Sequence, residues 1–335
     1  MATFKDYLEN KSPLILHGAL GTEMEALGYD ISGKLWSAKY LIEKPEVIQE
    51  IHETYVAAGA DLITTSSYQA TLPGLMEAGL TEKEAEQIIV LTVQLAKNAR
   101  DKVWAALDET EKAKRPYPLI SGDVGPYAAY LANGSEYSGD YGQITIEELK
   151  DFHRPRIQIL LDQGVDLLAL ETIPNRLEAQ ALIELLAEEF PESEAYLSFT
   201  VQESGTISDG TSLDEIAKLV SQSDQILALG INCSSPLLYD QALAILKNAG
   251  KALITYPNSG EIYDGRTQTW KPKDKDALTL VEHSKDWYAQ FGVKILGGCC
   301  RPLLFAGWHR SDTVKESNSA TDSAHEFAYA NGTTT

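Results

Sequence analysis

The chain has 335 residues, of which 44% are hydrophobic and 23% charged, the composition of an ordinary globular protein with ample material for a core. Its formal net charge of -21 makes nucleic acid and anionic membrane surfaces poor partners, because like charges repel. The N-terminus lacks a secretory signal, and no apolar run approaches the ~18–20 residues of a membrane span. We therefore expect a cytoplasmic protein, a monomer or small homo-oligomer, that binds neither nucleic acid nor membrane.

Short apolar runs alternate with helical stretches along the chain. Eight runs are predicted to be strands: 14–17, 62–66, 118–123, 166–171, 195–201, 226–231, 252–256 and 293–297. Helical periodicity marks the stretches 45–58, 82–106, 146–163, 177–189 and 213–220. Short, nearly all-apolar strands are typical of a parallel sheet that is buried on both faces. The alternation predicts an α/β fold, a single (β/α)8 TIM barrel over residues 1–301, and no Gly-x-Gly-x-x-Gly motif follows the first strand to favour dinucleotide binding.

The three cysteines, Cys233, Cys299 and Cys300, all follow predicted strands six and eight. Active-site residues of a barrel lie at the carboxyl ends of its strands, so all three fall where chemistry is expected. Their odd number in a long chain argues against a disulfide framework. The alternative is that they are buried cysteines acting as small hydrophobic residues.

Strands six and eight are near neighbours around a barrel, so the three sulfur atoms can converge on one point. Three thiolates bind Zn2+ at ~2.3 Å each and leave the fourth tetrahedral position open, as in a catalytic site. Such a zinc ion carries a net charge of about -1 and activates water poorly, but it lowers the pKa of a substrate thiol that coordinates it. The pattern predicts alkylation of a thiol, with the methyl group of a sulfonium as the natural electrophile.

Two motifs, GINCSSP at 230–236 and GGCCR at 297–301, closely resemble the homocysteine S-methyltransferase family, in its zinc-binding branch that uses S-methylmethionine or S-adenosylmethionine. Similar blocks stand at 18–25, 123–131, 134–137, 171–175 and 256–261. The resemblance implies Zn2+ on Cys233, Cys299 and Cys300, with the homocysteine thiolate as fourth ligand and methionine as product, an activity of methionine biosynthesis. It also implies that Glu171 helps to hold the homocysteine amino group and that Asn232 lies in the same pocket.

Two residues and the C-terminal tail leave alternative interpretations open. His17 stands where the family commonly carries Asp, so amine binding rests more on Glu171, and His17 is either a substrate contact or a structural histidine. Asp123 either lines the substrate pocket or caps the following turn. The tail 302–335 is rich in Ser, Thr, Asn and Ala without a helical stripe, and it resembles disorder or an altered reading frame. The atypical tail puts the eighth helix in doubt.

Three other functions remain compatible with the sequence. Within the family, the acceptor could be selenocysteine or selenohomocysteine. A barrel with a redox-sensitive cysteine pair could be an oxidoreductase, which would bind a flavin or nicotinamide and no stoichiometric zinc. A zinc-binding barrel without turnover would bind metal but transfer no methyl group from any donor.

Overall fold

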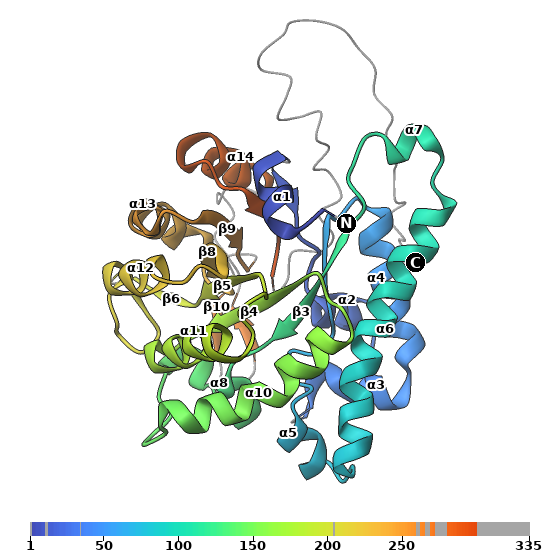
Figure 1. Cartoon of the computed structure of the whole chain (residues 1–335), viewed down its shortest axis with the longest axis horizontal. Coiled ribbons are helices and arrows are strands. Elements are labelled where there is room, and N and C mark those ends of the chain that lie inside the picture. The colour runs from blue at the N-terminus through green and yellow to red at the C-terminus, as the bar shows by residue number, and fades with distance from the viewer. Residues whose placement is uncertain are drawn as a thin grey trace, which may run out of the picture.

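The computed structural model describes residues 2–10, 13–33, 35–203, 205–258, 262–264, 269–271 and 280–299. Eight parallel strands form one sheet in the order β1-β12-β9-β8-β5-β4-β3-β2 (Figure 1). Their bounds are β1 (Leu14–Ile15), β2 (Leu62–Thr64), β3 (Leu119–Val124), β4 (Leu167–Ile173), β5 (Ala195–Phe199), β8 (Ile226–Asn232), β9 (Ala252–Tyr256) and β12 (Ile295–Leu296). A parallel bridge between Leu16 and Leu62 joins the two ends of the sheet. The predicted (β/α)8 barrel is confirmed.

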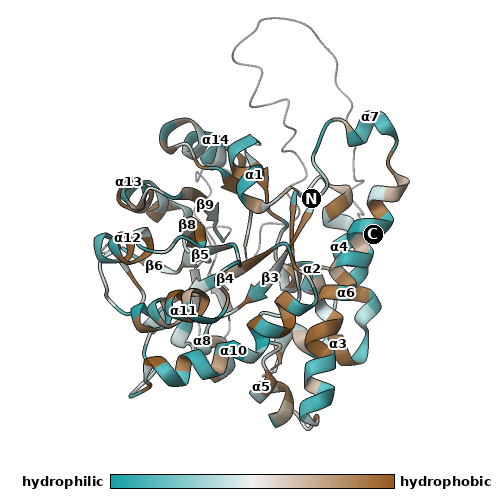
Figure 2. Cartoon of the chain, in the orientation of Figure 1, coloured by the Kyte–Doolittle hydropathy of each residue, from teal (hydrophilic) through white to brown (hydrophobic). Residues whose placement is uncertain are grey.

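Helices surround the barrel, and Figure 2 shows hydrophobic and hydrophilic residues interleaved along them. They are α1 (Phe4–Asn10), α2 (Leu20–Ala26), α3 (Tyr40–Glu43), α4 (Pro45–Ala57), α5 (Leu72–Glu77), α6 (Glu82–Ala106), α7 (Glu109–Lys112), α8 (Tyr127–Leu131), α9 (Ser135–Ser138), α10 (Ile146–Asp162), α11 (Arg176–Glu189), α12 (Leu213–Ser221), α13 (Tyr239–Leu246) and α14 (Leu280–Phe291). Short 3-10 helices are η1 (Trp36–Lys39), η2 (Pro236–Leu238) and η3 (Lys247–Ala249). Two small hairpins pair β6 (Val201–Gln202) with β7 (Thr206–Ile207), and β10 (Ile262–Asp264) with β11 (Thr269–Lys271).

The long helices begin where their sequences carry capping boxes. The Thr81 side chain accepts from the backbone of Glu84 at the start of α6, and Thr145 does the same for Glu148 at the start of α10. In each case the glutamate returns a hydrogen bond to the capping residue, so two unpaired backbone donors of the first turn are satisfied. These local signals explain why the predicted helix starts at 82 and 146 agree with the structure.

The strand ends agree less closely with the predictions. The predicted strand 195–201 divides into β5 and the hairpin strand β6, and the predicted strand 293–297 shortens to β12. Strand ends at a barrel rim leave the sheet to enter the loops, although their residues remain apolar. Hydrophobicity alone therefore does not mark where pairing stops.

The apolar core has two layers. One lies between the strands and the helices, and the other fills the inside of the barrel. Helix α1 contributes fully buried Phe4 to this inner layer, and its Tyr7 hydroxyl donates to the Tyr117 carbonyl just before β3 (2.6 Å). The amino ends of the strands are thus closed by α1, which leaves the opposite, carboxyl ends for function.

Residue Cys300 and the tail 302–335 lie outside the described residues, so the prediction for the tail stays a prediction. In the described part of the chain, no helix is both long and apolar enough to cross a membrane.

Candidate active site

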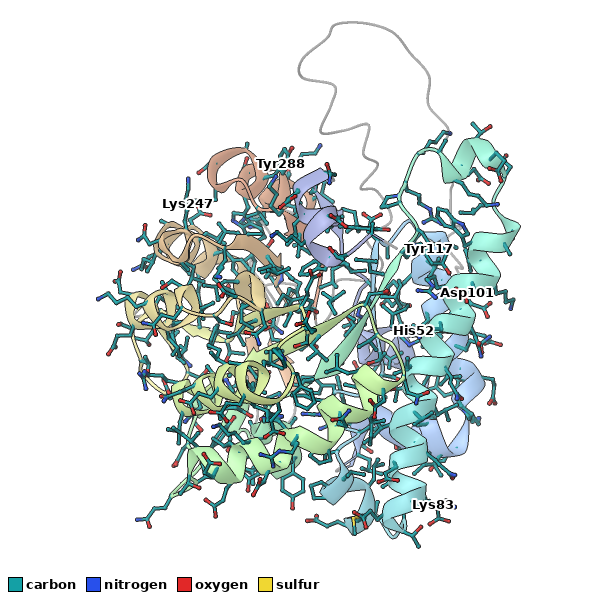
Figure 3. All side chains as sticks on the ribbon, in the orientation of Figure 1. His52, Lys83, Asp101, Tyr117, Lys247 and Tyr288 are labelled. Carbon is teal, nitrogen blue, oxygen red and sulfur yellow. A yellow bond between two sulfur atoms is a disulfide. The ribbon has the colours of Figure 1, made fainter. Side chains whose placement is uncertain are left out.

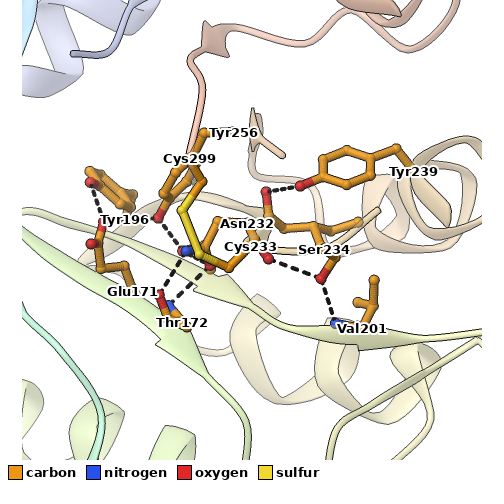
Figure 4. Close-up of a disulfide and its surroundings, with 12 residues drawn as sticks. Glu171, Thr172, Tyr196, Val201, Asn232, Cys233, Ser234, Tyr239, Tyr256 and Cys299 are labelled. Atoms are coloured by element: carbon orange, nitrogen blue, oxygen red, sulfur yellow. Dashed lines mark hydrogen bonds between the residues drawn. A yellow bond between two sulfur atoms is a disulfide. The ribbon is translucent and has the colours of Figure 1, made fainter. Parts of the chain in front are cut away.

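The carboxyl ends of β8 and β12 bring two of the predicted metal ligands together. Cys233 and Cys299 are joined as a disulfide, with their Cα atoms 5.7 Å apart (Figure 4). Backbone hydrogen bonds hold both cysteines to the end of β9: Cys233 N–H donates to the Tyr256 carbonyl (3.3 Å) and Cys299 N–H to the Pro257 carbonyl (2.7 Å). Cys233 has φ +45°, a left-handed conformation uncommon for a residue with a side chain.

The disulfide differs from the expectation that the cysteines would not be cross-linked. Its cause is geometric, because the ends of β8 and β12, on either side of β9, place the two Cα atoms within the ~4.4–6.8 Å range that a disulfide spans. The same proximity suits two thiolate ligands of one metal ion once the bond is reduced. Among the described residues no group of three His, Cys, Asp or Glu side chains is arranged to hold a metal, and the third predicted ligand, Cys300, lies outside them.

Glu171 lies in the same cluster, at an irregular end of β4. The β4–β5 register shifts between Leu170 and Ile173, in the stretch that contains this residue. Its Oε2 accepts hydrogen bonds from the hydroxyls of Tyr256 (3.2 Å) and Tyr196 (3.4 Å). Burial raises the pKa of Glu171 to about 7, against the lowering effect of the two tyrosine hydrogen bonds. The carboxyl has no cationic partner among the described residues, so an incoming ammonium group would fit beside it.

Asn232, the last residue of β8, is fully buried and holds three strand ends together. Its Oδ1 accepts from the Thr172 N–H (3.0 Å) and from the Ser198 hydroxyl (3.0 Å). Its Nδ2 donates to the Thr172 hydroxyl (2.7 Å), and the Ser198 hydroxyl also contacts that of Tyr256. Asn232 therefore lies close to Glu171, while these hydrogen bonds give it a positioning role for the adjacent Cys233.

Asp123, near the end of β3, is almost completely buried. Its backbone is tied to the β2 loop, since its N–H donates to the Thr65 hydroxyl (2.9 Å) and its carbonyl accepts from Ser67 (2.7 Å). One carboxyl oxygen, Oδ1, has no hydrogen-bond partner. Burial raises the pKa of Asp123 well above its usual value, the charge of Glu171 raises it further, and Arg156 opposes both. An unsatisfied buried carboxyl fits the pocket role better than a turn cap.

His17, directly after β1, contacts α4. Its ring centroid lies 5.5 Å from that of Tyr55 and 6.4 Å from that of His52, in edge-on arrangements. Burial lowers the pKa of His17 to about 3, with His52 adding to the effect, so the ring is neutral near pH 7. A neutral histidine cannot replace the anionic Asp of the family as a partner for an ammonium group. Its Nδ1 has no hydrogen-bond partner in the described structure.

Arg156 on α10 is a site-building residue that the sequence did not single out. Its guanidinium is buried and donates to the carbonyls of Ser67 (3.3 Å), Tyr68 (3.0 Å) and Gly125 (2.5 Å). A single cation thereby fixes the loops after β2 and β3. The sequence did contain one signal for this role, because Arg156 is a charged residue among the apolar positions of a helix that packs on the barrel.

Two aromatic residues near the rim were not assigned a role from the sequence. Tyr68 is half-buried, and its pKa lies well above the usual value because of desolvation and of the carboxylates of Glu136, Glu171 and Asp123. The Trp36 ring lies edge-on to it, with centroids 6.4 Å apart. Gly21 makes room for this ring, since a Cβ there would lie 2.6 Å from Trp36. The first-strand glycine motif is thus explained by packing against an aromatic residue.

A closed barrel with a cysteine pair and buried carboxyl groups at the carboxyl ends of its strands is the architecture of a (β/α)8 enzyme. The family model for homocysteine S-methyltransferase matches residues 14–302. The chain belongs to this family and is a methyltransferase, as its motifs predicted. The oxidoreductase alternative is therefore wrong.

Individual relatives agree with this assignment. Homocysteine S-methyltransferase YbgG of Bacillus subtilis is 44% identical over 93% of this chain and 99% of its own length. A selenocysteine methyltransferase of Astragalus bisulcatus is 40% identical over 86% of this chain and 88% of its own. Crystal structures of the Escherichia coli homocysteine methyltransferase MmuM, in a metallated and an oxidized form, each match with a TM-score of 0.75 at 41% identity, covering 88% of this chain and 93% of theirs.

Proposed function

We propose that this protein transfers a methyl group from a sulfonium donor, S-methylmethionine or S-adenosylmethionine, to the thiol of homocysteine, in a zinc-dependent reaction that gives methionine. The observation that carries the proposal is the convergence of Cys233, Cys299 and Glu171 at one end of the barrel. A substrate that is both a thiol and an amino acid needs thiolate-held metal for its sulfur and a carboxyl group for its ammonium. A cytoplasmic location is part of the proposal, because a reducing compartment keeps such thiols free.

The residues that would hold zinc are Cys233, Cys299 and Cys300. Two of them already lie within disulfide distance, which supports their meeting at one metal ion. When bound there, zinc would lower the pKa of a coordinating thiol so that it is a thiolate near pH 7. The similar Escherichia coli protein is described in both a metallated and an oxidized form, and we infer that this chain has the same two states.

The chain's own residues orient the two substrates. Glu171 binds the homocysteine ammonium, and Asn232 keeps the β8 end, and with it Cys233, in place beside it. The rings of Trp36 and Tyr68, edge-on with centroids 6.4 Å apart, would attract a sulfonium cation by cation–π interaction. Correct orientation of two bound reactants can lower the barrier by several kcal/mol, roughly 7–11 in the best intramolecular cases.

The chemical step needs no other reactant. A lone pair on the homocysteine sulfur forms the new C–S bond while the S+–CH3 bond of the donor breaks. The bond electrons return to the donor sulfur, which becomes a neutral thioether, and the thiol proton goes to solvent. The products are methionine and the demethylated donor, which is again methionine for S-methylmethionine and S-adenosylhomocysteine for S-adenosylmethionine.

Selenocysteine or selenohomocysteine is a second candidate acceptor. The 40% identical selenocysteine methyltransferase is the observation that favours it, because a selenol offers the same charge and a similar shape to the site. Competition between homocysteine and each selenol, measured as a ratio of kcat/KM values, decides between the acceptors.

The testing experiment combines metal analysis with methyl transfer. Reduced, zinc-supplied protein is expected to retain about one zinc per chain and to convert homocysteine to methionine with at least one of the two donors. The Cys299→Ser variant is expected to lose both properties, whereas Thr110→Ala, exposed on α7, keeps them. Zinc uptake without turnover would favour the inactive zinc-binding barrel. Well-folded, reduced protein that takes up no zinc would contradict the mechanism.

A further inference from the structure

The loop after β3 lies across the carboxyl ends of the neighbouring strands. The Glu136 carbonyl, in α9, accepts hydrogen bonds from the hydroxyls of Thr200 (3.0 Å) and Ser208 (3.1 Å), which follow β5. Asn175, which follows β4, donates from Nδ2 to the Gly139 carbonyl (2.8 Å). The loop is thus fixed by its backbone at both ends of α9, and its position is set before any substrate binds.

The fit between these loops depends on Gly139. A Cβ at this residue would lie 2.6 Å from the Asp209 Cβ and 2.7 Å from the Pro174 carbonyl oxygen, and its φ is +65°. Only glycine tolerates both the conformation and the contact. The close approach makes the loop a rigid part of the pocket wall.

These contacts that hold the loop involve the Glu136 backbone and not its side chain. Its carboxylate is half-buried and makes no salt bridge within the described part of the chain. Burial raises the pKa of Glu136, and the charge of Glu178 raises it further. A carboxylate held in this way gains stability from any cation that reaches it.

Glu136 belongs to a cluster of three carboxyl groups around the phenol of Tyr68. Asp123, Glu136 and Glu171 each raise the pKa of that phenol through their charge. The cluster is not satisfied internally, because Asp123 Oδ1 is buried without a hydrogen-bond partner. Arg156 faces Asp123, yet its guanidinium is already committed to three backbone carbonyls.

The number of carboxylates exceeds what homocysteine alone can neutralise. Its single ammonium group pairs with Glu171 in the proposed function, which leaves the Glu136 carboxylate, free of salt bridges in the described part of the chain, for the second substrate. We propose that Glu136 is a specificity-determining residue that binds the α-ammonium group of the methyl donor, so that the protein selects sulfonium donors that are themselves amino acids. The inference rests on the proposed function, because it requires a sulfonium donor.

A pair of donors that differ only in the amino group tests this role. S-methylmethionine carries the ammonium, and 4-(dimethylsulfonio)butanoate is the same molecule without it. In Glu136→Gln, kcat/KM for S-methylmethionine is expected to fall about ten- to a hundredfold, the usual effect of losing one charged hydrogen bond. The value for the des-amino donor and the KM for homocysteine are expected to stay within about twofold of wild type.

Two further variants guard against a merely structural effect. Glu192→Gln changes an exposed glutamate far from α9 in sequence and is expected to behave like wild type with both donors. Glu136→Asp keeps the charge and is expected to retain part of the preference for the ammonium-bearing donor. Titration calorimetry of S-methylmethionine into each variant gives donor affinity without turnover.

The outcomes separate the two proposals. An equal loss with both donors, or a raised homocysteine KM with unchanged donor selectivity, would overturn the role of Glu136 and leave the proposed function intact. If zinc-supplied wild type turns over neither donor nor S-adenosylmethionine, the proposed function itself fails and the inference fails with it.

Discussion

At the scale of single residues, the carboxyl groups of half-buried Glu171 and buried Asp123 differ in their partners. Glu171 accepts from two tyrosine hydroxyls, whereas Asp123 keeps an unpaired oxygen. Tyrosine hydrogen bonds stabilise the ionised carboxylate, which offsets part of the cost of burial. Glu171 is therefore the group that changes charge near neutral pH, and its pKa is raised to about 7.

Glu171→Gln is expected to raise the KM for homocysteine about tenfold or more, because an amide has no charge to pair with the ammonium. Steady-state kinetics at saturating donor measures this. In wild type the same KM is expected to fall as pH rises from about 6 to about 8, since only the ionised carboxylate binds the cation. This pH dependence disappears in the variant.

Tyr196→Phe is the matched control, because it removes one hydrogen bond but keeps the carboxylate. Its effect on the homocysteine KM at pH 8 is expected to be small. An unchanged KM in Glu171→Gln would show that another group binds the amine.

At the scale of elements, the contact between β8 and β9 determines where Cys233 lies. Gly230 permits that contact, because a Cβ at this position would lie 1.7 Å from the Ile254 carbonyl oxygen on β9. The obstacle is backbone, which cannot move aside as a side chain can. The strands must approach this closely for Asn232 and Cys233 to reach the rim in the observed register.

Gly230→Ala is expected to destabilise the fold by about 3 kcal/mol or more, at the upper end of overpacking effects. Gly122→Ala is the matched strand control, because its Cβ would meet only the Leu160 and Val165 side chains at 3.2 Å. Gly122→Ala is expected to lower the free energy of unfolding by only about 1 kcal/mol. Urea unfolding of both variants measures the difference, and equal costs would show that β8 and β9 can separate freely.

At the scale of the whole molecule, a buried neutral histidine links stability to pH. His52, labelled in Figure 3, is 1% exposed, and neither of its ring nitrogens is hydrogen-bonded in the described structure. Burial lowers its pKa to about 4. The unfolded chain, with an ordinary histidine pKa of about 6.5, binds the proton more readily. Stability is therefore complete above about pH 6.5 and is lost as the pH falls towards about 4.

Between pH 7 and pH 5 this linkage is expected to cost about 2 kcal/mol for His52. His52→Phe is expected to reduce the acid sensitivity, because no hydrogen bond is lost and the ring shape is retained. Urea unfolding at both pH values measures it, and Glu25→Gln, on the exposed face of α2, is the control. Identical pH dependence in His52→Phe and wild type would contradict this account.

Much of the fold followed from the sequence because the signals are local. The capping boxes before α6 and α10 and the short apolar strands predict the order of elements, and eight such units favour a closed barrel. The rim position of Cys233, Cys299 and Glu171 follows from the same rule, because each lies at or just beyond the carboxyl end of a strand.

Other features depend on contacts between distant segments, which no local pattern encodes. The closing bridge from Leu16 to Leu62, the three carbonyls gathered by Arg156 and the fixation of Glu136 by the β5 loop all join residues far apart in the chain. The sequence by itself determined the barrel and the family, since residue type and spacing specify them. Only the tertiary structure decided which carboxyl groups are unpaired, because burial and charge neighbours arise when the loops meet.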